Sequence, residues 1–173
     1  TIQSVIEEAR QTNSHHLILV SGEPGAGKTF LGLKIAHNTP NSVYLSGNGP
    51  LVEVLQDTLN NKTFVQSLYG YKRDYLQHGK TPHEQIIIFD EAQRAWDSQK
   101  MNGHLSEPDV IIQIAKAKKP WSVIIGLIGD GQEIHLGEES GLGLWNTAIQ
   151  NQGITVHAKH ENHLFSNAEH YEQ

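Results

Sequence analysis

The sequence has no cysteine among its 173 residues. Disulfide frameworks, thiol catalysis and cysteine-ligated zinc or iron–sulfur sites are therefore excluded, and the composition fits a reducing compartment. Aromatic residues make up 7% of the chain and charged residues 18%, whereas 37% of the residues are hydrophobic. These proportions are typical of a globular domain and not of a disordered or highly charged chain.

Long apolar runs are missing as well. The longest, at 86–89 and 123–128, have the length of strands and are far too short to span a membrane. The N-terminus also lacks the basic-then-apolar pattern of a secretion signal. We therefore expect a cytoplasmic protein with no membrane partner. The chain begins at Thr1 and not at Met, which fits either processing or excision from a longer protein, and we expect a fragment of a longer two-lobe protein.

The charge balance is acidic, with 13 basic and 19 acidic residues and a net charge of −6. This balance argues against electrostatic capture of nucleic acid by the whole surface, although a local basic groove remains compatible with it. The length is close to that of one domain and is too short for two full lobes. We therefore treat residues 1–173 as a single lobe.

Apolar, strand-sized runs alternate with helix-like stretches along the chain. The runs lie at 17–20, 43–45, 86–89, 123–128 and 154–156. This alternation predicts an α/β fold whose mainly parallel central sheet is covered by helices on both faces. We expect residues 60–85 to pack outside the sheet as helix and loop, and residues 157–173 to form a polar tail.

A phosphate-binding pattern follows the first strand. It consists of Gly22, Glu23, Pro24, Gly25, Ala26, Gly27, Lys28 and Thr29. In G-x-x-x-x-G-K-[ST], glycines let backbone N–H groups turn toward phosphate oxygens at a helix N-terminus. We expect Lys28 to reach the β- and γ-phosphates and the Thr29 hydroxyl to bind Mg²⁺.

Two further apolar runs deliver polar side chains to the same sheet edge. Asp90 and Glu91 follow the run at 86–89, which is a Walker B pattern: Asp90 is a predicted Mg²⁺ ligand and Glu91 a predicted base for the attacking water. The run at 123–128 leads to Asp130 and Gln132, either of which is a candidate γ-phosphate sensor. The pattern is similar to that of P-loop folds with a Glu after Walker B, in which such a third strand lies between the other two, and we expect the same order here.

The segments GEPGAGKT, FDEAQ and IGDGQ, in this order, resemble motifs I, II and III of superfamily 1 DNA/RNA helicases. FDEAQRAWD together with LIGDGQEIHLGEESGLGLW is more specifically similar to the Schlafen-group-3 helicase-like domain. The shared region covers about residues 17–146. The resemblance implies a three-layer RecA-like P-loop NTPase lobe with ATP and Mg²⁺ as cofactors. It also implies γ-phosphate sensing by Gln93 and Gln132.

The resemblance has two departures. Only Gly131 separates Asp130 from Gln132, where the helicase pattern has two residues. Superfamily 1 motors also use a second RecA-like lobe, which supplies an arginine finger and part of the surface for single-stranded DNA or RNA. Because such a finger is worth about 10³–10⁵ in rate, we expect the isolated lobe to hydrolyse ATP slowly.

Two other functions fit the same motifs. One is a nucleotide-dependent switch that controls a protein partner without moving along a strand, with the segment 90–96 as its moving element. The other is a small-molecule or nucleic-acid kinase. The acidic pair followed by Ala92-Gln93, together with the third strand, argues against a kinase.

Several weaker features have ordinary structural explanations beside functional ones. The loop 46–50 stands where helicases contact the strand, and it is equally consistent with a plain helix entry. Tyrosines interleave with basic residues over 69–75, which suits a nucleic-acid platform but fits better with a solvated helix. His157, His160 and His163 recur every third residue and could bind a metal from a helix, but a solvated tail is the better interpretation.

Overall fold

The computed structural model of the chain describes residues 2–22, 27–60, 64–101, 103–129 and 141–160. Its centre is a six-stranded sheet of order β3-β2-β4-β5-β1-β6, in which every neighbouring pair is parallel. The strands are β1 (His15–Ser21), β2 (Ser42–Ser46), β3 (Val65–Ser67), β4 (Ile86–Phe89), β5 (Ser122–Ile128) and β6 (Thr155–His160). The predicted α/β fold is confirmed, and β5 lies between β4 and β1 as expected.

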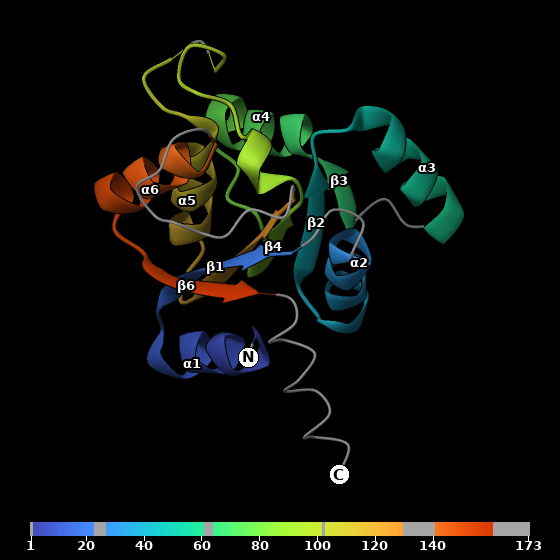
Figure 1. Cartoon of the computed structure of the whole chain (residues 1–173), viewed down its shortest axis with the longest axis horizontal. Helices are drawn as coiled ribbons and strands as arrows, with labels where there is room; N and C mark the ends of the chain where they lie inside the picture. Colours follow the sequence, from blue (N-terminus) through green and yellow to red (C-terminus); the bar gives the residue numbers. More distant parts are fainter. Residues whose placement is uncertain (1, 23–26, 61–63, 102, 130–140, 161–173) are drawn as a thin grey trace.

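Helices cover both faces of this sheet and give the predicted three layers (Figure 1). One face carries α1 (Ile2–Thr12), α2 (Lys28–Asn38) and α3 (Gly49–Leu59). The other carries α4 (Leu68–His78), α5 (Glu107–Ala117) and α6 (Gly141–Gln152), together with the short 3₁₀ turn η1 (Ala92–Arg94).

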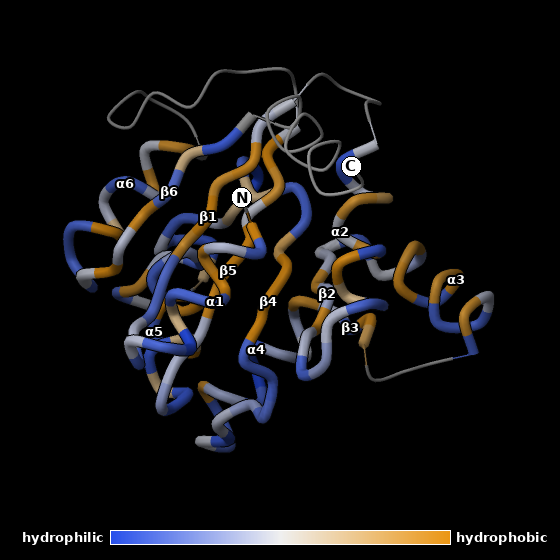
Figure 2. Tube along the Cα trace, turned by 90° about the horizontal axis from the view of Figure 1, so that it is seen from below, coloured by the Kyte–Doolittle hydropathy of each residue, from blue (hydrophilic) through white to orange (hydrophobic). Residues whose placement is uncertain are grey.

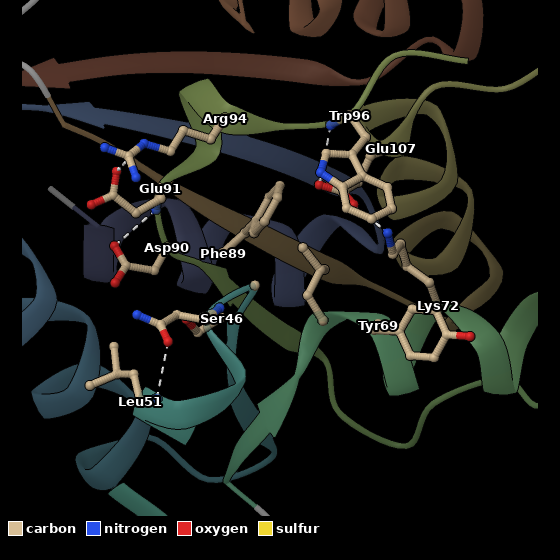
Figure 3. A pocket seen from close by; sticks show the side chains of 13 residues that line it. Ser46, Leu51, Tyr69, Lys72, Phe89, Asp90, Glu91, Arg94, Trp96 and Glu107 are labelled. Carbon is tan, nitrogen blue, oxygen red and sulfur yellow. Dashed lines mark hydrogen bonds and ion pairs between the residues drawn. The ribbon is translucent and has the colours of Figure 1, made fainter. Parts of the chain in front are cut away.

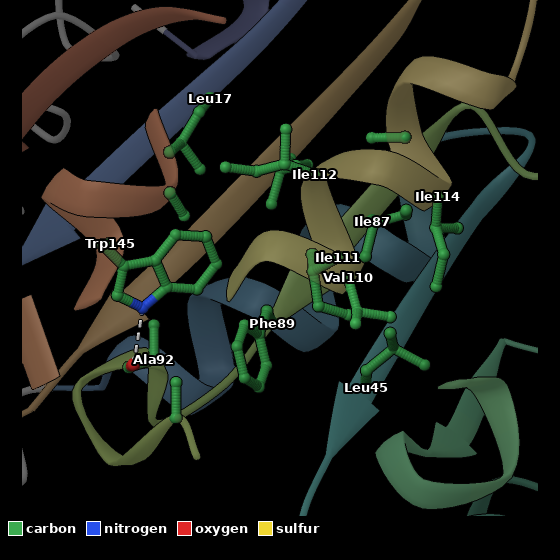
Figure 4. Close-up of a cluster of buried hydrophobic side chains, with 14 of the residues drawn as sticks. Leu17, Leu45, Ile87, Phe89, Ala92, Val110, Ile111, Ile112, Ile114 and Trp145 are labelled. Atoms are coloured by element: carbon green, nitrogen blue, oxygen red, sulfur yellow. Dashed lines mark hydrogen bonds between the residues drawn. The ribbon is translucent and has the colours of Figure 1, made fainter. Parts of the chain in front are cut away.

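The core is divided by the sheet into two apolar clusters. The central strands are apolar on both faces because crossover helices shield both sides from water, as the hydrophobic colours of β1 and β4 in Figure 2 show. Figure 4 shows the cluster under α5 and α6, where the rings of Phe89 and Trp145 lie 5.6 Å apart between centroids. The Trp145 indole N–H donates to the carbonyl of Ala92 at 2.7 Å, which fastens α6 to the turn after β4.

Two expectations about the sheet were wrong. Residues 60–85 do not all pack outside it, because Val65–Ser67 pairs with β2 as β3. This strand has only three residues, too few to show an apolar pattern. The expected polar tail also begins too early: His157 lies inside β6, an edge strand whose partial exposure admits polar side chains.

The absence of a side chain at Gly32 allows α2 to lie close to the sheet. A Cβ atom built there would lie 2.8 Å from Leu127 Cδ1, 3.0 Å from Tyr44 Cε2 and 3.1 Å from Ile88 Cγ2. The helix therefore rests on side chains of three different strands, with no room for a methyl group between them.

We predict that Gly32→Ala lowers the free energy of unfolding by about 1 kcal/mol, because overpacking costs about 1–3 kcal/mol and the better helix propensity of alanine returns about 1. Urea unfolding measures this change. The matched control is Gly49→Ala, since a Cβ at Gly49 meets nothing within 4 Å. A Gly32→Ala variant as stable as its Gly49→Ala counterpart would contradict the close-packing argument.

Candidate active site

The parallel sheet brings the predicted phosphate-binding loop and the acidic strand end to one edge. β1 ends at Ser21 and is followed by Gly22, and α2 begins at Lys28, which is 8% exposed. Gly27 caps α2 with φ at 90°, a left-handed conformation that favours glycine. The candidate residues Glu23, Pro24, Gly25 and Ala26 lie outside the described residues.

Asp90 is held by three hydrogen bonds at this edge. It is 7% exposed, and its Oδ2 accepts a hydrogen bond from the Thr29 hydroxyl at 3.1 Å. The same oxygen accepts from the Tyr44 hydroxyl, and Oδ1 accepts from the Glu91 backbone N–H at 2.9 Å. The two predicted Mg²⁺ ligands, 61 residues apart in the chain, are therefore in direct contact.

Tyr44 is a site residue that sequence reasoning missed. Burial raises the pKa of its hydroxyl, and the neighbouring carboxylate of Asp90 raises it further, so the phenol stays protonated and donates. In the sequence Tyr44 stands in a buried strand like any core residue, and its partner follows only from β2 lying beside β4.

Glu91 lies one residue beyond Asp90 but points elsewhere. Its backbone adopts φ 53°, an uncommon left-handed conformation for a residue with a side chain, and the strand ends there in a turn. The side chain is 49% exposed and lies 3.7 Å from the Arg94 guanidinium, measured between Oε2 and Nε. Asp90 is thus directed inward and Glu91 outward.

Gln93 connects Glu91 to the end of the third strand. Its amide nitrogen donates to Glu91 Oε2 at 2.6 Å, and its amide oxygen accepts from the Gly129 backbone N–H at 2.9 Å. A Cβ on Gly129 would lie 2.9 Å from the Gln93 amide nitrogen, so any side chain there would displace the Gln93 amide from this position. The other two candidates for sensing, Asp130 and Gln132, lie outside the described residues.

A pocket of about 540 Å³ opens beside the acidic pair (Figure 3). Ser46 and Asn48 line one side of it, and the partly exposed rings of Tyr69 and Trp96 line another. The loop 46–50 and the start of α4 therefore meet at this site, although the sequence treats them as separate features.

The basic and aromatic stretch of α4 is largely not a surface platform. Tyr71 and Lys72 are buried, and the Lys72 ammonium forms an ion pair with Glu107 while lying 4.8 Å from the Trp96 ring centroid. Tyr69 is 63% exposed, with the Arg73 guanidinium 5.8 Å from its ring centroid. The expected solvated helix is confirmed at the exposed Tyr69 and Arg73 but is wrong for Tyr71 and Lys72, which pack into the protein.

None of the helices in the described part of the chain has the length and hydropathy needed to cross a bilayer. No curated protein matches the sequence. Among solved structures, the chain is similar to the crystal structure of the Pyrococcus furiosus Hef helicase domain, with a TM-score of 0.53 and 20% identity. The likeness covers 93% of this chain and 38% of that one, which supports the RecA-like fold and means that this chain spans less than half of that structure's length.

A family comparison gives the narrower result. Residues 15–168 match the family described as Schlafen group 3, DNA/RNA helicase domain. The match takes in both the candidate phosphate-binding loop and the acidic strand end. The chain therefore belongs to the Schlafen group 3 DNA/RNA helicase domain family.

Proposed function

We propose that this chain is the ATP-binding, Mg²⁺-dependent NTPase lobe of a helicase-like protein that acts on DNA or RNA in the cytoplasm. The observation that carries the proposal is the 3.1 Å contact between the Thr29 hydroxyl and Asp90 Oδ2. Hydroxyl and carboxylate oxygens are the ligands that Mg²⁺ takes beside nucleotide phosphates. Their direct contact across the strand order β4-β5-β1 supports a metal site at the start of α2.

The chain's own residues divide the work of hydrolysis. Lys28, at the N-terminus of α2, places a positive charge where the phosphates would lie, and the helix dipole adds to it. Mg²⁺, when bound by Thr29 and Asp90, would neutralise charge on the phosphates. The exposed Glu91 carboxylate would orient the attacking water and accept its proton.

Gln93 would report on the γ-phosphate through its contact with Glu91. Asp130 and Gln132 stay predictions for the same task. Gln93 already bridges Glu91 and the end of β5, so a change at either end would be passed to the catalytic carboxylate.

Single-stranded DNA or RNA would bind near the pocket at the loop 46–50, where Tyr69 and Trp96 offer faces on which bases can stack. The cations there are largely paired, Lys72 with Glu107 and Arg94 with Glu91. Few charges are left for phosphate contacts, so tight binding would need the second RecA-like lobe of the longer protein. The same lobe would supply the arginine finger, and the isolated lobe would turn over slowly.

We predict that Lys28→Ala weakens binding of a fluorescent ATP analogue with Mg²⁺ by about tenfold or more, since a hydrogen bond to a charged group is worth about 1.5–3 kcal/mol. Equilibrium fluorescence anisotropy measures the loss. Lys34→Ala is the matched control, because Lys34 lies exposed on the same helix. Equal affinities for the two variants would rule out the phosphate role of Lys28.

We predict that Glu91→Gln keeps nucleotide affinity but lowers ATP hydrolysis by the full-length protein by about 10²–10⁴, the usual contribution of a general base. Single-turnover hydrolysis separates the chemical step from binding. Glu53→Gln, on the exposed side of α3, serves as the control and should match the wild type. If Glu91→Gln hydrolyses ATP at the wild-type rate, Glu91 is not the base.

We predict that single-stranded DNA or RNA stimulates ATP hydrolysis by the full-length protein, because strand binding closes the two lobes of a motor around the nucleotide. Titrating each strand into a steady-state assay measures the effect. If neither strand changes the rate, and a pull-down captures a protein partner in only one nucleotide state, the lobe is instead a nucleotide-dependent switch. Residues 90–96 would be its moving element. Phosphoryl transfer to an acceptor other than water would instead indicate a kinase.

A further inference from the structure

Three side chains able to bind a metal meet at the far end of β1 from the nucleotide site. They are Glu8 on α1, His16 on β1 and His157 on β6, and one possible ligand atom of each lies within 4.8 Å of the others. His16 is buried, His157 is half-buried and Glu8 is exposed. α1 and β1 follow each other in the chain, whereas His157 lies 141 residues after His16 and joins them through the pairing of β1 with β6.

The two histidines already have nearly the spacing that a shared metal ion requires. His16 Nδ1 and His157 Nε2 lie 3.0 Å apart. With zinc–nitrogen bonds of about 2.0–2.1 Å, two nitrogens at a tetrahedral angle stand about 3.3 Å from each other. The spacing is therefore within a few tenths of an ångström of that around a shared ion, and a rotation of the rings would turn both lone pairs toward it. The Glu8 side chain, on the exposed side of its helix, can move to supply an oxygen.

A hydrogen bond to the other nitrogen of His16 suits this use. His16 Nε2 lies 2.7 Å from the Ser14 hydroxyl oxygen, which in turn lies 2.6 Å from the Thr12 hydroxyl oxygen. When Nε2 donates to Ser14, the lone pair of Nδ1 faces His157, the tautomer that a metal needs.

We propose that Glu8, His16 and His157 form a binding site for a zinc-type divalent cation, with the Ser14 hydroxyl as the outer partner of His16. Two imidazole nitrogens and one carboxylate oxygen form a ligand set that binds Zn²⁺ in preference to Mg²⁺. The ion would fasten α1 and the edge strand β6 to β1. Since His16 is the second residue of β1 and the phosphate-binding loop follows the last, this site is separate from the predicted Mg²⁺ site.

The other explanation is a pair of neutral histidines that only hydrogen-bond to each other and stack, with ring centroids 5.2 Å apart. The two explanations differ in what the removal of Glu8 does, because the carboxylate has no part in the histidine pair. They also differ in the response to Zn²⁺, which a simple hydrogen-bonded pair would not bind at a fixed stoichiometry.

The test is calorimetric titration of the untagged, chelator-treated chain with Zn²⁺ in excess Mg²⁺, which occupies sites made of oxygen ligands alone. We expect one Zn²⁺ to bind per chain. Glu8→Gln and His157→Gln should each weaken binding about tenfold or more, since even outer partners of metal ligands are worth about 10–100-fold. Ser14→Ala should weaken Zn²⁺ binding by about 10–100-fold, because Ser14 is the outer partner of His16. The absorption spectrum of Co²⁺ bound in place of Zn²⁺ should show fewer than six ligands and change in His157→Gln.

Three controls lie outside the proposed site: Glu7→Gln, next to Glu8 on α1, His83→Gln, an exposed histidine, and the double variant His160→Gln/His163→Gln. All three should bind Zn²⁺ as the wild type does, and circular dichroism confirms that each variant is folded. Absence of saturable Zn²⁺ binding by the wild type would overturn the proposal. Binding that survives in folded Glu8→Gln and His157→Gln but disappears in the double variant would overturn it as well.

Discussion

The parallel pairing of β4, β5 and β1 is the constraint on which the rest of the molecule depends. Ile88 aligns with Ile125, and Ile125 with Ile18, so the three strands run in register and end at one edge. Because parallel strands need crossover connections, helices must cover both faces, and the strands become apolar throughout. The polar residues that follow the three strands are then the first that can be exposed to solvent, and all of them lie at the same edge of the sheet.

At this edge the protein fixes one carboxylate and leaves the next one adjustable. Asp90 receives hydrogen bonds from Thr29, Tyr44 and the Glu91 backbone, so its two oxygens are oriented before any ligand arrives. Such preorganisation removes the cost of ordering the site when a ligand binds. Glu91, by contrast, is half exposed and is contacted by Gln93 and Arg94, two polar side chains of its own turn.

The sequence predicted the parts of this structure that depend on local pattern. The five apolar runs all overlap strands of the sheet, and the loop 46–50 does lead into a helix, α3. What it could not predict depends on which strands become neighbours. Tyr44 reaches Asp90 only because β2 lies beside β4, and His157 reaches His16 across 141 residues only because β6 pairs with β1. No local pattern encodes these pairs.

The same separation of local from distant contacts explains why Gln93 matters more than its place in a motif suggests. Its contact with Glu91 is local, but its contact with Gly129 joins two strands, and the indole of Trp145 fixes the neighbouring residue Ala92 from α6. The turn after β4 is thus hydrogen-bonded to the residue that follows β5 and to α6. Trp145 and Ala92 are fully buried, whereas the Glu91 side chain is half exposed, so Glu91 has room to move that the other two residues lack. In the proposed function, in which Glu91 is the base, a displacement at the end of β5 would reach that carboxylate through Gln93.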